Sequence, residues 1–385
     1  MRILKGTLTV FSSLGLSCAL LVLLGLLTWL GTLEQVHSGL YEVQKKYFES
    51  FFFLHAAGPL SVPLPGANLV MCLLFVNLLV GGIVRLRKGW SKAGILTIHA
   101  GIGFLLLSGF VKMYFSEDGH VTLFERQSAD HFESYYRWEI AVLEDLGDGR
   151  VREHLVPQED FADARGPRPV TLTSVELPFD LELSHYMRNC APMPKGPMFE
   201  VRVPVVDGVF LQSRAPEKEA ELDTAGVYVA LLDEAGERRA GILWGRQLQP
   251  LAVTVGGRDF GIDLRRERYP MPFTIRLDEF TKEDHPRIDM ARAFSSDVTV
   301  IEGAASRPVE ISMNEPLRHQ GLVLYQSSWG PSDAGPGEPL FSTFSVVRNP
   351  ADQYPLYACF VIAAGLVLHF SRKLAGYVRS EARKS

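Results

Sequence analysis

Four long runs without an acidic or basic residue constrain this chain most, because a helix needs about 20 apolar residues to cross a membrane. The runs cover residues 6–33, 56–84, 93–111 and 353–371. Although 22% of the 385 residues are charged, the mean hydropathy is +0.08, so the apolar residues are concentrated in part of the chain. We therefore predict transmembrane helices over residues 8–30, 67–84, 94–111 and 355–371.

The first run could instead be a signal peptide, because Arg2 and Lys5 precede it. However, the run is long, and no A-x-A-like cleavage site follows it. We therefore expect a retained helix.

Basic residues beside the runs predict the orientation, since Lys and Arg are enriched in cytoplasmic loops. In chain order the basic clusters are Arg2 and Lys5, then Arg85, Arg87, Lys88 and Lys92, then Arg372, Lys373, Arg379, Arg383 and Lys384. With four spans all three clusters fall on one side, which predicts that both termini are cytoplasmic. The loop 31–66 and the segment 112–354 then lie outside.

The segment 112–354 is one long insertion between the third and fourth helices. Short alternating runs recur in it, such as WEIAVL, GVYVALL and GLVLYQSSW, separated by turn sequences such as DEAGE. This pattern predicts a β-sandwich or a barrel-like sheet, and the length is ample for a core. The predicted fold class is an integral membrane protein with a large external all-β domain. We divide it into residues 1–111, 112–354 and 355–385, the last being the fourth helix with a basic tail.

Composition and motifs exclude several functional classes. The net charge is −5 and no basic patch interleaved with aromatic residues occurs, so nucleic acid is not an expected partner. G-x-S-x-G, P-loop and H-E-x-x-H motifs are absent, and we assign no catalytic residue. The four cysteines form no C-x-x-C pair, which excludes a thiol–disulfide relay and a c-type cytochrome.

The histidines of the insertion show no metal-site spacing. We expect surface or satisfied loop positions for His120, His131, His154, His185, His285 and His319.

The loop 31–66 is rich in aromatic residues with interspersed lysines, in GTLEQVHSGLYEVQKKYFESFFFLH. This composition suits a helix that lies in the membrane interface and caps the bundle. Contact with a partner subunit is the alternative.

The order of parts and three motifs resemble the ResB (CcsB-type) family of cytochrome c biogenesis proteins. GTLEQ (31–35) lies where that family has a Gly-Thr turn after its first helix, and HAGIGFLLLSG (99–109) resembles its third helix. ISMNEPLRHQGLVLYQSSW (311–329) is similar to its Asn-x-Pro-Leu … Gly … Tyr-Gln-Ser-Ser signature, the most specific of the three motifs. The resemblance extends along the chain, although residues 130–260 carry no diagnostic motif.

The resemblance implies system II cytochrome c biogenesis, in a complex that exports haem and attaches it to apocytochrome c. A CcsA (ResC) partner would carry the tryptophan-rich haem loop, since the five tryptophans here form no WWD-like cluster. The chain would then be a non-autonomous subunit of a cytochrome c synthase (haem lyase). It would lie in the bacterial inner membrane with its β domain in the periplasm. Expected ligands are haem b in transit, apocytochrome c and membrane lipid.

Residues of the first and last motifs are candidate partner contacts. They are Gly31, Thr32, Gln35, Asn314, Pro316, Gly321, Tyr325, Gln326 and Trp329. Tyr325 to Trp329 are expected at a strand end that packs the domain against the membrane or the partner.

His99 lies about 9 Å inside the third predicted helix, and an ionisable residue there indicates function. Gly101 and Gly103 flank it, and they either let a neighbouring helix approach or leave a flat slot for a porphyrin. Neutral imidazole is an axial ligand of haem iron, and the resemblance implies that role for His99. The alternative is a histidine hydrogen-bonded to a neighbouring helix.

A second axial ligand is not evident in the sequence. His369, the other histidine within a predicted span, is a candidate haem ligand, but it lies one turn from Arg372, which favours snorkelling to the interface. A ligand from the partner is therefore expected.

Two other functions stay open. The chain could be a scaffold or chaperone that holds apocytochrome c or the partner without binding haem, or a membrane-anchored β domain of unrelated purpose.

Overall fold

The computed structural model describes residues 9–384 except 59, 87–88, 148, 198–199, 234, 285–290, 332–334 and 336–337. Several residues used in the predictions lie outside the described residues: Arg2, Lys5, Leu8, Arg87, Lys88 and His285. The chain forms two compact units. The helical unit comprises Met1–Glu117 and Arg348–Ser385, and the β unit comprises Asp118–Val347.

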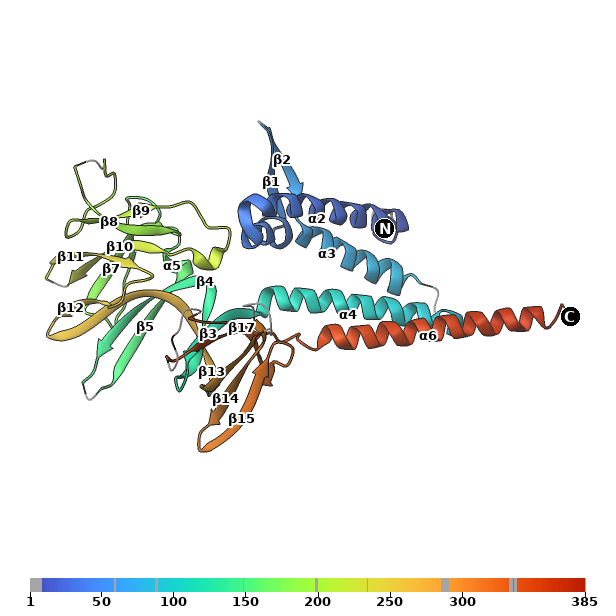
Figure 1. Ribbon diagram of the computed structural model, residues 1–385. Coiled ribbons are helices and arrows are strands. Elements are labelled where there is room, and N and C mark those ends of the chain that lie inside the picture. The colour runs from blue at the N-terminus through green and yellow to red at the C-terminus, as the bar shows by residue number, and fades with distance from the viewer. Residues whose placement is uncertain are drawn as a thin grey trace. The chain divides into compact units, whose positions relative to one another are not determined.

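The long helices of the helical unit are α2 (Leu14–Val43), α3 (Ala67–Asn77), α4 (Ala93–Phe115) and α6 (Tyr354–Glu381) (Figure 1). A π-helix, η2 (Leu78–Val84), continues α3, and a 3₁₀ turn, η3 (Trp90–Lys92), precedes α4. Among the described residues, four helices are long and apolar enough to cross a membrane: Leu14–Glu49, Ala67–Val84, Trp90–Phe115 and Tyr354–Glu381. The predicted plan of four helices is confirmed.

The first helix starts later and ends later than the sequence predicted. Ser13 caps its start, because the Ser13 hydroxyl accepts a hydrogen bond from Leu16 N at 3.0 Å. The helix continues past residue 31 and bends at Gly39, whose φ of 76° suits glycine. A π-helix, η1 (Gln44–Glu49), follows.

A hairpin completes the first loop, where the sequence predicted a helix. Its strands are β1 (Phe52–Ala57) and β2 (Leu60–Pro65), which pair antiparallel. Pro63 and Pro65 disfavour a helix interior, whereas an edge strand accepts them. The helical part of the loop therefore ends at Glu49.

The β unit is built from antiparallel strands around two cores (Figure 1). Its strands include β3 (Glu117–Phe124), β4 (Ser128–Asp145), β5 (Val151–Pro157), β6 (Val170–Leu172), β7 (Phe179–Met187), β8 (Cys190–Pro194), β9 (Val209–Ser213), β10 (Gly226–Asp233) and β11 (Arg238–Trp244). The later strands are β12 (Leu251–Val255), β13 (Arg258–Asp284), β14 (Ala291–Glu302), β15 (Ala305–Ser312), β16 (Leu317–His319), β17 (Leu322–Gly330) and β18 (Phe341–Arg348). Short helical turns are α5 (Gln158–Phe161) and η4 (Ala220–Leu222).

The largest sheet in the described part of the chain curves into a nearly closed barrel. Its order is β15-β14-β13-β4-β3-β18-β17-β16, with β12 beside β13 and β5 beside β4. The first strand of this order, β15, lies next to β16 and β17 at the other end. Alternate side chains point inward and form one core, which includes Phe132, Ile275, Leu324 and Phe344. The predicted barrel-like sheet is confirmed.

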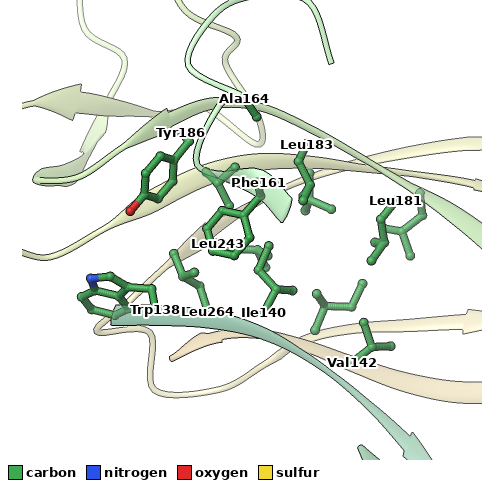
Figure 2. Packing of buried hydrophobic residues seen from close by; sticks show 14 of the residues in the cluster. Trp138, Ile140, Val142, Phe161, Ala164, Leu181, Leu183, Tyr186, Leu243 and Leu264 are labelled. Carbon is green, nitrogen blue, oxygen red and sulfur yellow. The ribbon is translucent and has the colours of Figure 1, made fainter. Parts of the chain in front are cut away.

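A second sheet, in the order β11-β10-β7-β6, covers the other core. In Figure 2, Ile140 and Val142 of β4 lie opposite Leu181 and Leu183 of β7. Trp138 is 3% exposed at the edge of this core. One face of its indole contacts the guanidinium of Arg266 at 4.1 Å.

Gly245 also lies against the Trp138 ring, and its replacement tests this packing. A Cβ on Gly245 would lie 2.0 Å from Trp138 Cζ3. We expect Gly245→Ala to destabilise the β unit by about 1–3 kcal/mol through overpacking. Urea unfolding of the purified full chain, followed by tryptophan fluorescence, measures the change. Gly166→Ala is the control, since no atom lies within 4 Å of its added Cβ; equal midpoints for both variants would contradict the prediction.

Candidate functional site

His99 lies half-buried on α4, with its ring directed at the end of η2. Nδ1 lies 2.8 Å from the carbonyl oxygen of Gly82. A carbonyl oxygen only accepts, so Nδ1 carries the hydrogen and donates it. Nε2 then keeps a free lone pair, and no hydrogen bond to Nε2 is found within the described ranges of the chain. The hydrogen bond thus selects the Nδ1–H tautomer of the neutral imidazole.

The Gly82 carbonyl is available because of its place in η2. The last carbonyl groups of a helix have no partner within the helix, and Gly82 is two residues from the end of η2. In a membrane such a group needs another donor, since water is absent there. His99 supplies that donor from α4, and the bond ties the second and third membrane helices together.

Gly82 also permits the short approach of the ring. A Cβ at this position would lie 2.9 Å from His99 Nδ1 and 3.1 Å from Leu78 Cδ1. Any larger residue would push the imidazole away from the carbonyl. The glycine and the π-helix, a feature frequent at functional sites, together set the position of the His99 ring.

This arrangement has two chemical interpretations. Metal-binding histidines usually donate one ring N–H to a carbonyl or carboxylate and bind the metal through the other nitrogen. His99 has that hydrogen bond and a free Nε2. The same bond also serves the structural alternative, a histidine that links two helices. Among the described residues no group of three His, Cys, Asp or Glu side chains could hold a metal ion, so His99 would act with a group supplied from outside the chain.

The two candidate slot glycines face different helices. A Cβ on Gly101 would lie 2.6 Å from Ile362 Cγ1 on α6, whereas one on Gly103 would meet Leu78 at 3.7 Å. Both glycines are buried. Small residues allow close helix packing, and this role accounts for Gly101. A role in a haem slot stays a prediction.

His369 lies on α6 near the start of α4. A Cβ on Gly94 would be 2.7 Å from the His369 backbone nitrogen. His99 is five residues further along α4, about 7.5 Å along the helix axis. The His369 ring contacts Phe370 at 5.3 Å, and none of the contacts in the described part of the chain joins it to His99.

Gln326 of the last motif lies inside the barrel and is 9% exposed. Its Oε1 accepts a hydrogen bond from Ser296 Oγ at 2.8 Å, and its Nε2 donates to Ser342 Oγ at 2.7 Å. These serines come from β14 and β18. The network therefore links three strands around the barrel interior, a structural role that burial favours over partner contact.

The remaining residues of the last motif form turns and one ring cluster. Trp329 stacks on Phe280 at 5.7 Å, and Lys282 Nζ lies 4.8 Å from its ring. Tyr325 is 36% exposed, and the other three motif positions are Asn314, Pro316 and Gly321. Gly321 takes φ 79° in the turn between β16 and β17. Asn314 is exposed and lines a cleft of about 420 Å³.

The first motif lies within α2, not in a turn. Gly31 is buried, and a Cβ there would lie 3.2 Å from Val43 Cγ1. Thr32 Oγ1 donates to Thr28 O at 2.8 Å, and Gln35 is exposed. Gly31 therefore lets the segment after the Gly39 bend fold back onto α2.

A partly buried polar cluster beside this motif was not found from the sequence. Tyr47 is fully buried, and its Oη lies 2.6 Å from Glu34 Oε2 and 2.7 Å from His55 Nδ1. Lys46 Nζ lies 2.6 Å from Glu34 Oε1. Glu34, within GTLEQ, was the available signal, because a carboxylate so close to an apolar run requires partners.

The described histidines of the β unit lie on strands, where the sequence predicted surface or loop positions. His131 pairs with Asp130 at 2.8 Å, and His319 pairs with Glu302 at 3.1 Å. His120 stacks on Tyr135 at 5.1 Å, and burial lowers its pKa because it disfavours imidazolium. Each has its own neighbours, and the set forms no common site.

Comparison with known proteins bears on the β unit. Residues 252–340, which extend from β12 to the start of β18, match the model of the ResB-like family. That segment includes the motif 311–329. The resemblance is confirmed over this segment, and for the membrane helices it stays a prediction.

The alignments with individual proteins cover shorter segments. The chain is 41% identical over 69 residues to a cytochrome c biogenesis protein CcsB from Prochlorococcus marinus (strain NATL1A). A CcsB from Synechococcus sp. (strain RCC307) is 36% identical over 58 residues. The aligned parts cover 18% and 14% of this chain, and 16% and 13% of those proteins. The chain thus matches about a sixth of the length of the first relative.

Gln326→Ala tests whether the ResB-like motif stabilises the barrel. We expect a loss of about 1–3 kcal/mol in unfolding free energy, because the Ser342 and Ser296 hydroxyls lose a buried partner. Urea unfolding of the full chain measures it. Ser327→Ala, an exposed neighbour on the same strand, should change stability by less than about 0.5 kcal/mol. A Gln326→Ala protein as stable as Ser327→Ala would show that the network contributes nothing.

Proposed function

We propose that this chain is a subunit of a membrane system for cytochrome c biogenesis, system II, and that His99 binds haem in transit. The ResB-like segment 252–340 supports the first part of the proposal. The single observation that carries the second part is the hydrogen bond from His99 Nδ1 to the Gly82 carbonyl. In the neutral imidazole it places the hydrogen on Nδ1 and leaves the lone pair of Nε2 available for axial ligation.

Haem is the substrate of this site, and the chain supplies orientation. The carbonyl of Gly82 fixes the ring plane of His99 and prevents the opposite tautomer. Since α4 carries the histidine within a span, the ligand would act away from bulk water. His99 would supply one ligand to haem iron, and a second ligand would have to come from elsewhere.

A CcsA/ResC-type subunit is the proposed source of the second ligand. His369 lies beside Gly94, at the start of α4. It is therefore closer than His99 to the basic end of the helices. One central histidine cannot supply both axial positions, which supports a partner. Such a complex would be the cytochrome c synthase, in which this chain positions haem relative to apocytochrome c and is not an autonomous enzyme.

The proposed topology places both termini in the cytoplasm and the β unit in the periplasm of a bacterium. Support comes from the basic ends of the helices. Arg85 follows η2, Lys92 precedes α4, and Arg372 lies three residues beyond His369 on α6. Because Gly94 contacts His369, Lys92 and Arg372 share one end of the helical unit.

A scaffold without bound haem is the second candidate function. The packing of Gly101 against Ile362 favours it, because this contact explains the glycine without a porphyrin. In that case the β unit would hold apocytochrome c or the partner. Haem content of the His99 variants separates the two functions.

His99→Gly should remove haem from the chain co-purified with its CcsA-type partner. The expected result is loss of most of the haem absorbance, and its return when imidazole is added, because free imidazole can occupy the space of the ring. Absorption spectra of the complex measure both effects. Equal haem in wild type and variant would make His99 structural and leave the scaffold function.

Gly82→Ala should weaken haem binding without removing the ligand. The added Cβ displaces the His99 ring from the carbonyl, and loss of such a supporting hydrogen bond typically lowers metal affinity about tenfold or more. Haem titration followed by absorbance and electron paramagnetic resonance reports the affinity and the axial ligation. Gly109→Ala on the same helix is the control, since no atom lies within 4 Å of its added Cβ. Matching spectra and affinities for both variants would refute the role of Gly82.

A further inference from the structure

The β1–β2 hairpin has two unlike faces. One face packs inward: the Phe53 ring lies 4.4 Å from the Tyr47 ring, and His55 Nδ1 contacts Tyr47 Oη at 2.7 Å. The other face is open and apolar, with Phe52 70% exposed and Leu54 64% exposed. Their cross-strand neighbours are Pro65 and Pro63. The contact with Tyr47 fixes which face points outward.

The base of this hairpin is joined to the ends of the membrane helices. Gly66 N donates to Phe51 O at 2.8 Å, and α3 begins at the next residue. Asn68 Nδ2 lies 3.2 Å from Glu49 O and 3.0 Å from Tyr114 Oη near the end of α4. The end of η1, the start of α3 and the end of α4 therefore lie side by side. The chain leaves α4 at this end of the helical unit and enters the β unit.

Aromatic side chains cluster at that level. Tyr114 and Phe115 end α4 at this level, and both are exposed. Such belts mark the boundary between membrane and water. The hairpin thus emerges at the height of the lipid headgroups, and Figure 1 shows it projecting sideways from α2 and α3.

Composition and backbone favour lipid as the occupant of the open face. No Asp, Glu, Lys or Arg occurs from residue 50 to 84. Two prolines of β2 lie within the ladder, so their missing N–H groups are those that would point away from β1. The outer edge of β2 therefore lacks two donors, which discourages a partner strand and lowers the cost of contact with lipid.

Exposed apolar side chains also occur on α2, where Val36 is 62% exposed and Leu40 is 61% exposed. Both residues lie in the candidate span Leu14–Glu49. An uncharged open face at headgroup height, in a unit whose candidate spans also expose apolar side chains, fits the upper part of the bilayer. The remaining open edge of β1 requires water or headgroups as partners, so the hairpin cannot enter the hydrocarbon centre.

We propose that the β1–β2 hairpin lies along the membrane surface, with Phe52 and Leu54 inserted among lipid headgroups and upper acyl chains. It would act as a lateral anchor at the end of the helical unit that leads into the β unit. This inference does not depend on haem binding by His99.

Fluorescence quenching in lipid nanodiscs tests the proposal with the full chain. Leu54→Trp adds one indole to the open face, and its emission is obtained by subtracting the wild-type signal. Leu248→Trp is the matched control, because Leu248 is 100% exposed in the β unit. Phosphatidylcholine brominated near the carbonyl end of its acyl chains reports shallow lipid contact, lipid brominated near the chain middle reports deep contact, and iodide reports water.

We expect shallow bromolipid to quench the Leu54→Trp emission at least about twofold more than the Leu248→Trp emission. Shallow bromolipid should also quench the Leu54→Trp emission more strongly than deep bromolipid does. Iodide should quench the Leu248→Trp emission more strongly than the Leu54→Trp emission. Quenching of Leu54→Trp by iodide alone would place the face in water and overturn the proposal. Protection from both quenchers would mean that protein covers the face, which would overturn it as well.

Discussion

The absence of water from the hydrocarbon core is the constraint on which the helical unit depends. Polar groups within the spans must find partners inside the protein. The threonines bond within their own helices, whereas Asn77 and His99 bond across helices. Asn77 is 7% exposed; its Nδ2 donates to Phe11 O at 2.8 Å, and its Oδ1 accepts from Ser17 Oγ at 2.6 Å. His99 serves the Gly82 carbonyl in the same way. The polar residues of the spans thus set the register between helices that are otherwise apolar.

Hydropathy and alternation were sufficient to predict the helices and the β domain, because both depend on long patterns that single residues do not change. The start of α2 at Leu14 and its bend at Gly39 depend instead on one cap and one φ angle. The hairpin at 52–65 was missed since its aromatic residues suit an interface whether they lie on a helix or on strands. The composition of this segment predicted a place at the membrane interface. Pro63 and Pro65 favour strands over a helix there.

For the candidate site, the sequence predicted the residue, a histidine within a membrane span, but not the group to which its side chain bonds. A histidine within a span is visible in the sequence, whereas its partner, the carbonyl of Gly82, belongs to the backbone and leaves no sequence signal. Gln326 shows the opposite case. Its motif suggested partner contact, but the alternation along β17 directs it inward to Ser296 and Ser342.

The length of β13 makes the two cores of the β unit interdependent. Phe260 and Leu264 belong to one core, and Phe273 and Leu277 of the same strand belong to the other. β4 pairs with β13 along most of this length, from Ser128 to Glu144. A segment cut at residues 252–340 would keep β13 but lose β4, leaving a long row of unpaired backbone groups. The unit that folds cooperatively is therefore longer than the stretch defined by sequence similarity, since it begins more than a hundred residues earlier in the chain.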